Sequence, residues 1–183
     1  WEAWIKDTRD SEYYRIVLMP DNKWWLAQNV KLASYGGSSV GAAISGCTKD
    51  ECGRRYTCAQ VYASSASTGT VQGICPSGWL LPIRATYNTL ASAIGNMATV
   101  CASLRTYDSS CSPISDSYGW SSRVGICNGG KCPYPAWYTN DAGREDGFII
   151  DINAATNTKI CNNYVVNAVG ENEYPVVRCF RQL

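Results

Sequence analysis

The stretch Gln72-Gly-Ile-Cys-Pro-Ser-Gly-Trp-Leu-Leu-Pro82 is the part of this chain that most constrains its fold. Pro76 fixes its own φ angle, and Gly78 permits a tight turn that other residues resist. The turn lets Trp79 enter the interior, where a large apolar ring system can anchor a core. Pro82 stands where a helix is expected to begin, a favoured place for proline. The stretch is therefore predicted to be scaffold, not a ligand site.

Helices are predicted on both sides of this turn. Downstream, Pro82–Met97 has apolar residues at nearly helical spacing, and Gly95-Asn96 is a stop signal. Upstream, Arg55–Ser64 is predicted to form a shorter helix.

The first third of the chain predicts a β-hairpin. Tyr13–Met19 and Trp24–Val30 are rich in β-branched and aromatic residues and flank the turn-forming residues 20–23. The charged segment Lys6–Glu12 is predicted to be a lead-in. Residues 32–53, rich in Gly, Ser and Ala, are predicted to be a disulfide-stapled loop.

The second half is predicted to be rich in loops. Residues 98–136 are dominated by Ser, Gly, Pro, Asn and Cys, and long irregular stretches are usually functional or crosslinked. Three short strands are expected at Gly147–Ile152, Lys159–Val166 and Tyr174–Phe180. With no internal repeat, residues 1–183 are predicted to form a single α+β domain with two helices, small antiparallel sheets and long stapled loops.

The cysteines indicate an oxidising compartment. The chain has 10 cysteines and no histidine, and it lacks the C-x-x-C pairs of common zinc sites. So many structural thiols are typical of secreted or surface proteins, which predicts an extracellular domain with up to five disulfides. The sequence leaves open whether a leader, lipid anchor or pilin segment precedes Trp1.

The charge balance argues against two classes of partner. Sixteen Lys and Arg residues face fifteen Asp and Glu residues, for a formal net charge of +1. We therefore expect neither nucleic-acid binding nor attraction to an anionic membrane, and no apolar run is long enough for membrane insertion.

Several motifs, taken in order, resemble the Fibrobacter succinogenes major paralogous domain, a bacterial family associated with the C-type-lectin-like fold. The match at 72–82 is the most specific, and the others gain weight from their order along the chain. They are Asp7-Thr-Arg-Asp10 with Tyr14 and Val17, Trp24-Trp-Leu-Ala-Gln-Asn-Val30, Gly53-Arg-Arg-Tyr-Thr57 and Val177-Arg-Cys179. Cys58 and Leu80 depart from the family's usual tryptophan and histidine.

The resemblance implies how the domain closes. In C-type-lectin-like folds a helix cysteine bonds to the last strand, which pairs Cys75 with Cys179. Closing a loop of about a hundred residues would contribute about 4–5 kcal/mol in the chain-entropy model. Cys101 with Cys111 and Cys127 with Cys132 are close enough for local staples. Three pairings remain for the other four cysteines, of which we favour Cys47–Cys52 with Cys58–Cys161.

The resemblance also implies where a ligand would bind, because lectin-like domains usually bind through the late segment before the last strand. Residues 134–174 are rich in aromatic, Asn and acidic residues, which stack on sugar rings or bind hydroxyl groups and peptide backbone. The alternative is that the aromatic residues belong to the core and the Asn residues serve turns. The predicted ligand-binding residues, expected on one face, are Trp137, Tyr138, Asn140, Asp141, Arg144 and Tyr164.

No cofactor is expected, and calcium is the alternative. Trp137-Tyr-Thr-Asn-Asp141 superficially resembles the Trp-Asn-Asp calcium motif of C-type lectins with two extra residues, and its usual partner motif is absent. Calcium needs six to eight oxygen ligands. Some could come from Asn140, Asp141, Glu145, Asp146 and Asp151.

A binding function is favoured over catalysis. Without histidine the Ser-His-Asp and Cys-His nucleophile arrangements cannot be built, and any acid-rich loop offers the carboxylates of a glycosidase. The leading hypothesis is a surface recognition module, not an enzyme, that binds a glycan or a protein. The alternative is a structural subunit or tip domain that assembles into a surface filament or pilus.

Overall fold

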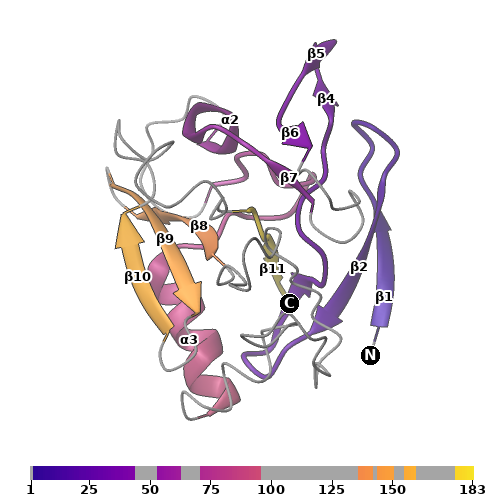
Figure 1. Ribbon diagram of the computed structural model, residues 1–183. Coiled ribbons are helices and arrows are strands. Elements are labelled where there is room, and N and C mark those ends of the chain that lie inside the picture. The colour runs from indigo at the N-terminus through magenta and orange to yellow at the C-terminus, as the bar shows by residue number, and fades with distance from the viewer. Residues whose placement is uncertain are drawn as a thin grey trace, which may run out of the picture.

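The computed structural model describes residues 2–43, 53–62, 71–95, 136–141, 144–150, 155–159 and 176–183, and of the strands between 136 and 159 it describes the backbone alone (Figure 1). Within these residues the architecture is α+β, as predicted, with two helices and small antiparallel sheets. None of the described helices is long and apolar enough to span a membrane.

The main sheet has the strand order β1-β2-β3-β11, with antiparallel neighbours throughout. Its strands are β1 (Glu2–Lys6), β2 (Tyr13–Leu18), β3 (Lys23–Leu26) and β11 (Phe180–Gln182). The predicted hairpin is confirmed as β2 and β3. Strand β1 was missed, because the charged lead-in begins at its last residue and hid the alternation of Glu2-Ala-Trp-Ile-Lys6.

Strand β3 ends four residues before the predicted Val30. The Leu26 carbonyl accepts a hydrogen bond from Arg178 Nη1 at 2.9 Å, and Asn29 Oδ1 accepts one from Arg178 Nη2 at 2.7 Å. The backbone N–H of Val30 donates to the Val177 carbonyl at 2.8 Å. The segment after Leu26 is therefore held by the C-terminal segment, but outside a regular strand.

Short strands interrupt the loop predicted over residues 32–53. Strands β4 (Ser34–Tyr35) and β5 (Ser38–Ser39) form a hairpin, and β6 (Ala42–Ala43) pairs with β7 (Arg54–Arg55). Gly36 and Gly37 form the hairpin turn with φ of 59° and 80°, a conformation that favours glycine. The loop prediction was thus wrong over these residues.

Both predicted helices are present, and each begins later than predicted. Helix α2 spans Cys58–Tyr62, and α3 spans Arg84–Ile94. Ile83 holds the N-cap position of α3 with extended backbone, so Pro82 precedes the cap and does not stand in the first turn. The predicted stop is confirmed at Gly95, whose φ is 129°.

A second sheet follows α3 in sequence and contacts it (Figure 1). It has the order β10-β9-β8, from β8 (Ala136–Asp141), β9 (Arg144–Ile150) and β10 (Ala155–Lys159). Strand β9 overlaps the expected Gly147–Ile152. Of the expected strand Lys159–Val166 only Lys159 lies within the described residues, as the last residue of β10. The expected strand Tyr174–Phe180 was wrong over residues 177–179, which lie outside a strand, and β11 begins at Phe180. Most of the irregular stretch 98–136 lies outside the described residues.

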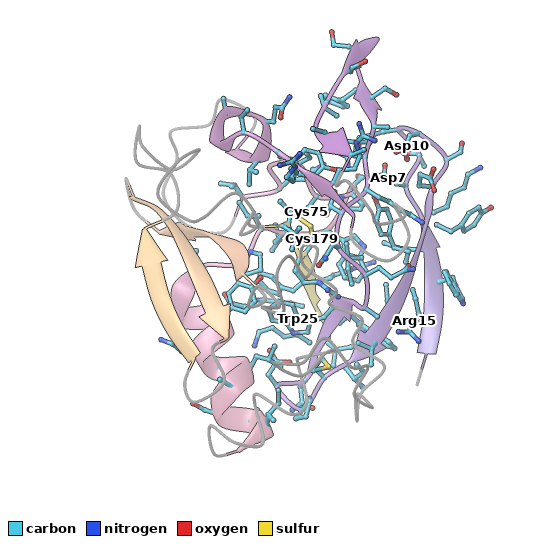
Figure 2. All side chains as sticks on the ribbon, viewed as in Figure 1. Asp7, Asp10, Arg15, Trp25, Cys75 and Cys179 are labelled. Atoms are coloured by element: carbon cyan, nitrogen blue, oxygen red, sulfur yellow. A yellow bond between two sulfur atoms is a disulfide. The ribbon has the colours of Figure 1, made fainter. Side chains whose placement is uncertain are left out.

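The main sheet buries side chains on both of its faces. One face places Tyr14, Ile16 and Leu26 in a core with Trp79 and Tyr56. The other face carries Trp25, which is labelled in Figure 2. Trp25 packs against Tyr87 of α3 and against Phe180, with ring centroids 5.3 Å and 5.5 Å away. Burial of Trp79 is confirmed at 3% exposure.

The neighbouring residues Trp24 and Trp25 of β3 differ in burial. Trp24 is only partly buried, whereas its neighbour Trp25 is 0% exposed. Neighbouring residues of a strand point to opposite faces, and the face of Trp25 is the one that α3 covers. The indole Nε1 of Trp25 donates to Asp21 at 3.2 Å, so burial leaves this polar group paired.

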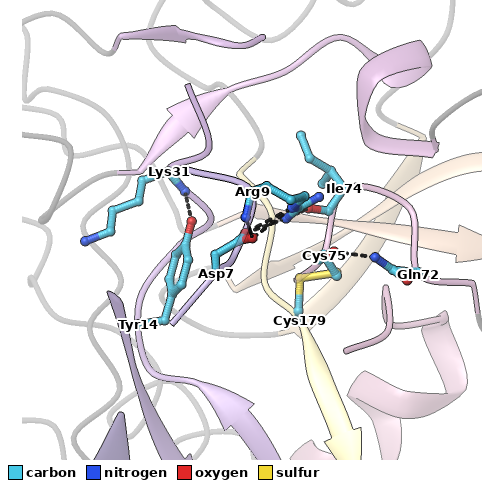
Figure 3. The surroundings of a disulfide bond; sticks show 8 residues. All are labelled: Asp7, Arg9, Tyr14, Lys31, Gln72, Ile74, Cys75 and Cys179. Atoms are coloured by element: carbon cyan, nitrogen blue, oxygen red, sulfur yellow. Dashed lines mark hydrogen bonds and ion pairs between the residues drawn. A yellow bond between two sulfur atoms is a disulfide. The ribbon is translucent and has the colours of Figure 1, made fainter. Parts of the chain in front are cut away.

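The expected bond between Cys75 and Cys179 is present, with a Cα–Cα distance of 5.8 Å and a sequence separation of 104 (Figure 3). Cys75 lies in the turn between α2 and α3, not in a helix as the resemblance implied. The remaining pairings stay predictions. Only the backbone of Cys58 is described, and outside the described residues lie Cys47, Cys52, Cys101, Cys111, Cys127, Cys132 and Cys161.

Replacement of Trp25 tests this account of the core. We expect Trp25→Ala to lower the free energy of unfolding by about 3–5 kcal/mol, as for other large core truncations. Tyr35→Ala is the matched control, because Tyr35 is 58% exposed, and should change it by less than about 1 kcal/mol. Urea unfolding followed by circular dichroism measures both values. Equal losses would contradict the assignment of Trp25 to the core.

Candidate functional site

Five of the six predicted ligand-binding residues lie on one β-hairpin. Trp137, Tyr138, Asn140 and Asp141 belong to β8, and Arg144 begins β9 after a connection of two residues. Asp141 is the cross-strand partner of Arg144, and Asn140 is the partner of Glu145. A segment predicted to be loop therefore forms two paired strands at these positions, and the pairing brings the candidates together on one hairpin.

The strand register divides these five residues into two sets. Successive strand positions belong to opposite faces, and direct cross-strand partners share a face. Trp137, Asp141 and Arg144 therefore hold positions of one face of the hairpin, while Tyr138 and Asn140 hold positions of the other. The expectation of a single shared face is wrong for these five at the level of register. The part that each plays in ligand binding stays a prediction.

Two of the late candidates fall outside the described residues. These are Tyr164, from the ligand set, and Asp151, from the calcium set. Of the other calcium candidates, Asp141 is paired in register with a cation, Arg144. In the portion of the chain that the structure describes, there is no group of three or more His, Cys, Asp or Glu residues that could hold a metal ion.

The opening motif Asp7-Thr-Arg-Asp10 forms an internal clamp beside the disulfide (Figure 3). Arg9 Nη2 lies 2.6 Å from Asp7 Oδ2, and Arg9 Nε donates to Asp7 Oδ1 at 2.9 Å. Arg9 Nη2 also donates to the carbonyl of Ile74 at 2.8 Å. Because Ile74 precedes Cys75, the clamp ties the β1–β2 connection to the Cys75–Trp79 turn. These residues therefore position the scaffold.

Two buried tyrosines of the core hydrogen-bond to the backbone of the segment after β3. The Tyr14 hydroxyl accepts a hydrogen bond from the backbone N–H of Lys31 at 3.0 Å. The Tyr56 hydroxyl donates to the Leu32 carbonyl at 2.9 Å. Both contacts satisfy backbone groups inside the protein, where an unpaired group would cost about 1–3 kcal/mol. Tyr14 and Tyr56 thus have a structural role.

Burial controls the ionisation of three tyrosines. It raises the pKa of Tyr14 well above its ordinary value, although the Lys31 N–H lowers that pKa in part. Burial likewise raises the pKa of Tyr56 and of Tyr87, which packs beneath Trp25. Burial lowers the pKa of Arg9, but the hydrogen bond and charge of Asp7 outweigh it and leave that pKa raised.

Sequence reasoning missed an exposed aromatic surface at the start of the chain. Trp4 on β1 is 61% exposed, and Tyr13 on β2 is 53% exposed. Lys6 Nζ lies 5.8 Å from the centroid of the Tyr13 ring, a cation–π contact. The signal was the alternation over Glu2–Lys6, which places Trp4 and Lys6 on one face and Ala3 and Ile5 on the other.

Comparison with known proteins identifies no relative. No protein-family model, curated protein or solved structure matches this chain.

The buried tyrosines predict a loss of stability at high pH. Unfolded tyrosines lose their protons near pH 10, whereas Tyr14, Tyr56 and Tyr87 hold theirs to higher pH in the fold. Above about pH 10 the unfolded state therefore binds fewer protons, and stability falls by about 1.4 kcal/mol per pH unit for each tyrosine. Below about pH 9 the three tyrosines are protonated in both the folded and the unfolded state, so they should add no pH dependence to the free energy of unfolding.

Urea unfolding between about pH 8 and about pH 11, measured promptly after each pH change, tests this expectation. Tyr56→Phe should reduce the alkaline slope by the contribution of one tyrosine, even though it loses the hydrogen bond to Leu32 at every pH. An unchanged slope in this variant would refute the assigned role of Tyr56.

Proposed function

We propose that this chain is an extracellular recognition module of the C-type-lectin-like kind, related to the Fibrobacter succinogenes major paralogous domain. In this proposal it binds a glycan or a protein surface through the β8–β9 hairpin and the residues that follow. The observation that carries the proposal is the gathering of Trp137, Tyr138, Asn140, Asp141 and Arg144 on that hairpin.

A binding role is supported by the separation in sequence between the residues that stabilise the fold and the candidate ligand-binding residues. The motif residues Asp7, Arg9, Tyr14 and Tyr56 make internal contacts that hold the main sheet to the disulfide-bonded turn. The candidate hairpin comes from a different part of the chain, between α3 and β11. A scaffold fixed by a disulfide and buried hydrogen bonds can present a binding hairpin with little entropy lost on binding.

The register favours one set of ligand contacts. Trp137, Asp141 and Arg144 combine an aromatic ring, a carboxylate and a guanidinium at positions of one hairpin face. An aromatic ring can stack on the apolar face of a sugar, while the charged groups bind hydroxyls or peptide backbone. Tyr138 and Asn140 would form a second contact set if the ligand wraps the hairpin.

The extracellular location rests on cysteine chemistry. Ten cysteines in 183 residues and a buried Cys75–Cys179 disulfide are typical of a chain that folds under oxidising conditions. Calcium is not required by this proposal, because the ligand contacts named above need no metal.

Ligand binding and stability should separate in hairpin variants. A glycan array and a panel of surface proteins would first supply a ligand. We then expect Trp137→Ala and Arg144→Ala to weaken binding at least tenfold, or about 1.4 kcal/mol each, while unfolding changes by less than about 1 kcal/mol. Titration calorimetry measures the affinity. Tyr35→Ala is a matched control, because Tyr35 is an exposed aromatic on another hairpin.

Two outcomes would contradict the assignment. Normal binding after replacement of all six predicted residues would place the ligand elsewhere. A loss of affinity in Tyr35→Ala equal to that in Trp137→Ala would show that the effect is not specific to β8.

The compartment can be tested through the thiols. We expect the native chain to carry no free thiol, because its cysteine count is even and Cys75 and Cys179 form a disulfide. Alkylation under denaturing, non-reducing conditions followed by mass spectrometry should label essentially none. Labelling of several cysteines would contradict both the stapled loops and the extracellular proposal.

A further inference from the structure

Strand β1 forms one edge of the main sheet. Its five residues pair with β2 from Glu2↔Val17 to Lys6↔Tyr13. In the described part of the chain no strand lies against the other side of β1, and Figure 1 shows it as the outermost strand. Backbone N–H and C=O groups along such an edge are a template for pairing with a further strand.

The sequence of β1 is complementary to itself when two copies run antiparallel. If Trp4 of one copy lies opposite Trp4 of a second copy, Glu2 lies opposite the second copy's Lys6, and Lys6 lies opposite the second copy's Glu2. Ala3 then lies opposite the second copy's Ile5. Both charged positions are thus matched by opposite charge, which stabilises cross-strand pairs.

Neighbouring registers lack this match. A pairing centred on Ala3 sets Glu2 against the second copy's Trp4, and a pairing centred on Ile5 sets Lys6 against it. Each leaves a charged position without an opposite charge in the partner strand. Charge complementarity therefore selects the register centred on Trp4.

The exposed face of β1 fits the same register. Trp4 is 61% exposed, a large apolar surface at the centre of the proposed pairing. Lys6 is also exposed and lies over the Tyr13 ring on β2. An edge lysine commonly discourages pairing with other chains, but here its charge would meet the second copy's Glu2.

We propose that two copies of this chain associate through their β1 edges, in antiparallel register centred on Trp4, to form one continuous sheet. The contact is isologous, since the same strand serves both copies, and it therefore closes at a dimer without forming a filament. It is independent of the proposed ligand site, because β8 and β9 belong to the other sheet.

Charge reversal tests the register. Sedimentation equilibrium of the purified chain from about 10 µM to about 1 mM should show a monomer–dimer equilibrium. Glu2→Lys or Lys6→Glu alone sets like charges opposite one another twice, so each should weaken dimerisation at least tenfold. The double variant Glu2→Lys/Lys6→Glu restores both opposite-charge pairs and should dimerise like the wild type.

Mixing the two single variants gives an independent check. One carries lysine at both positions and the other glutamate, so together they should form a heterodimer more readily than either forms a homodimer. Arg181→Glu is the matched control, because it makes the same charge change at an exposed residue of the opposite edge strand, β11. It should dimerise like the wild type, and circular dichroism verifies that every variant is folded.

Three results would overturn the proposal. One is a wild-type chain that stays monomeric over the whole concentration range. A second is dimerisation of Lys6→Glu equal to that of the wild type. The third is growth into species larger than a dimer, which would indicate head-to-tail assembly through a different surface.

Discussion

The rest of the described structure depends on one constraint, the attachment of the last strand, β11, to the turn that contains Cys75. Strand β11 has three residues, too few to hold a sheet edge alone. The Cys75–Cys179 bond fixes it across 104 residues, and Leu80 and Phe180 exchange backbone hydrogen bonds at 2.8 Å and 3.0 Å. In the chain-entropy model a loop of this length contributes about 4–5 kcal/mol by restricting the unfolded chain.

Buried charge gives this closure its specificity. Arg178 is fully buried beside Cys179, and its guanidinium binds the Leu26 carbonyl and the Asn29 amide oxygen. Next to the other cysteine of the disulfide, Cys75, Arg9 joins buried Asp7 to the Ile74 carbonyl. Charges removed from water are tolerated only where such partners exist, so a displaced last strand would leave Arg178 unsatisfied. The apolar core alone would not distinguish neighbouring registers as sharply.

Sequence reasoning succeeded where the signal is local and failed where a distant residue decides. The Cys75–Trp79 turn, the helix stop at Gly95 and the β2–β3 hairpin follow from residues within a few positions. By contrast, the carbonyl of Leu26, the last residue of β3, accepts a hydrogen bond from Arg178, 152 residues away, which no local pattern predicts. Trp24 and Trp25 carry the same local signal, and the residues that pack on each face of the sheet decide how far each is buried. The short β1 carried a two-residue period that its charged ends obscured.

For the candidate site, composition predicted the segment but not the strand register within it. Aromatic, amide and charged residues concentrated after position 134 identified the segment, and the strands β8 and β9 gather five of them. Composition could not reveal that these residues alternate along a strand, because a polar aromatic segment suits a loop and a strand equally well. Once the segment is a strand, the period of two assigns Trp137 and Asp141 to one face, and the pairing of Asp141 with Arg144 adds a cation there. The register therefore separates Trp137, Asp141 and Arg144 from Tyr138 and Asn140, and a ligand on one face of the hairpin, as proposed, would face only one of these two sets of positions.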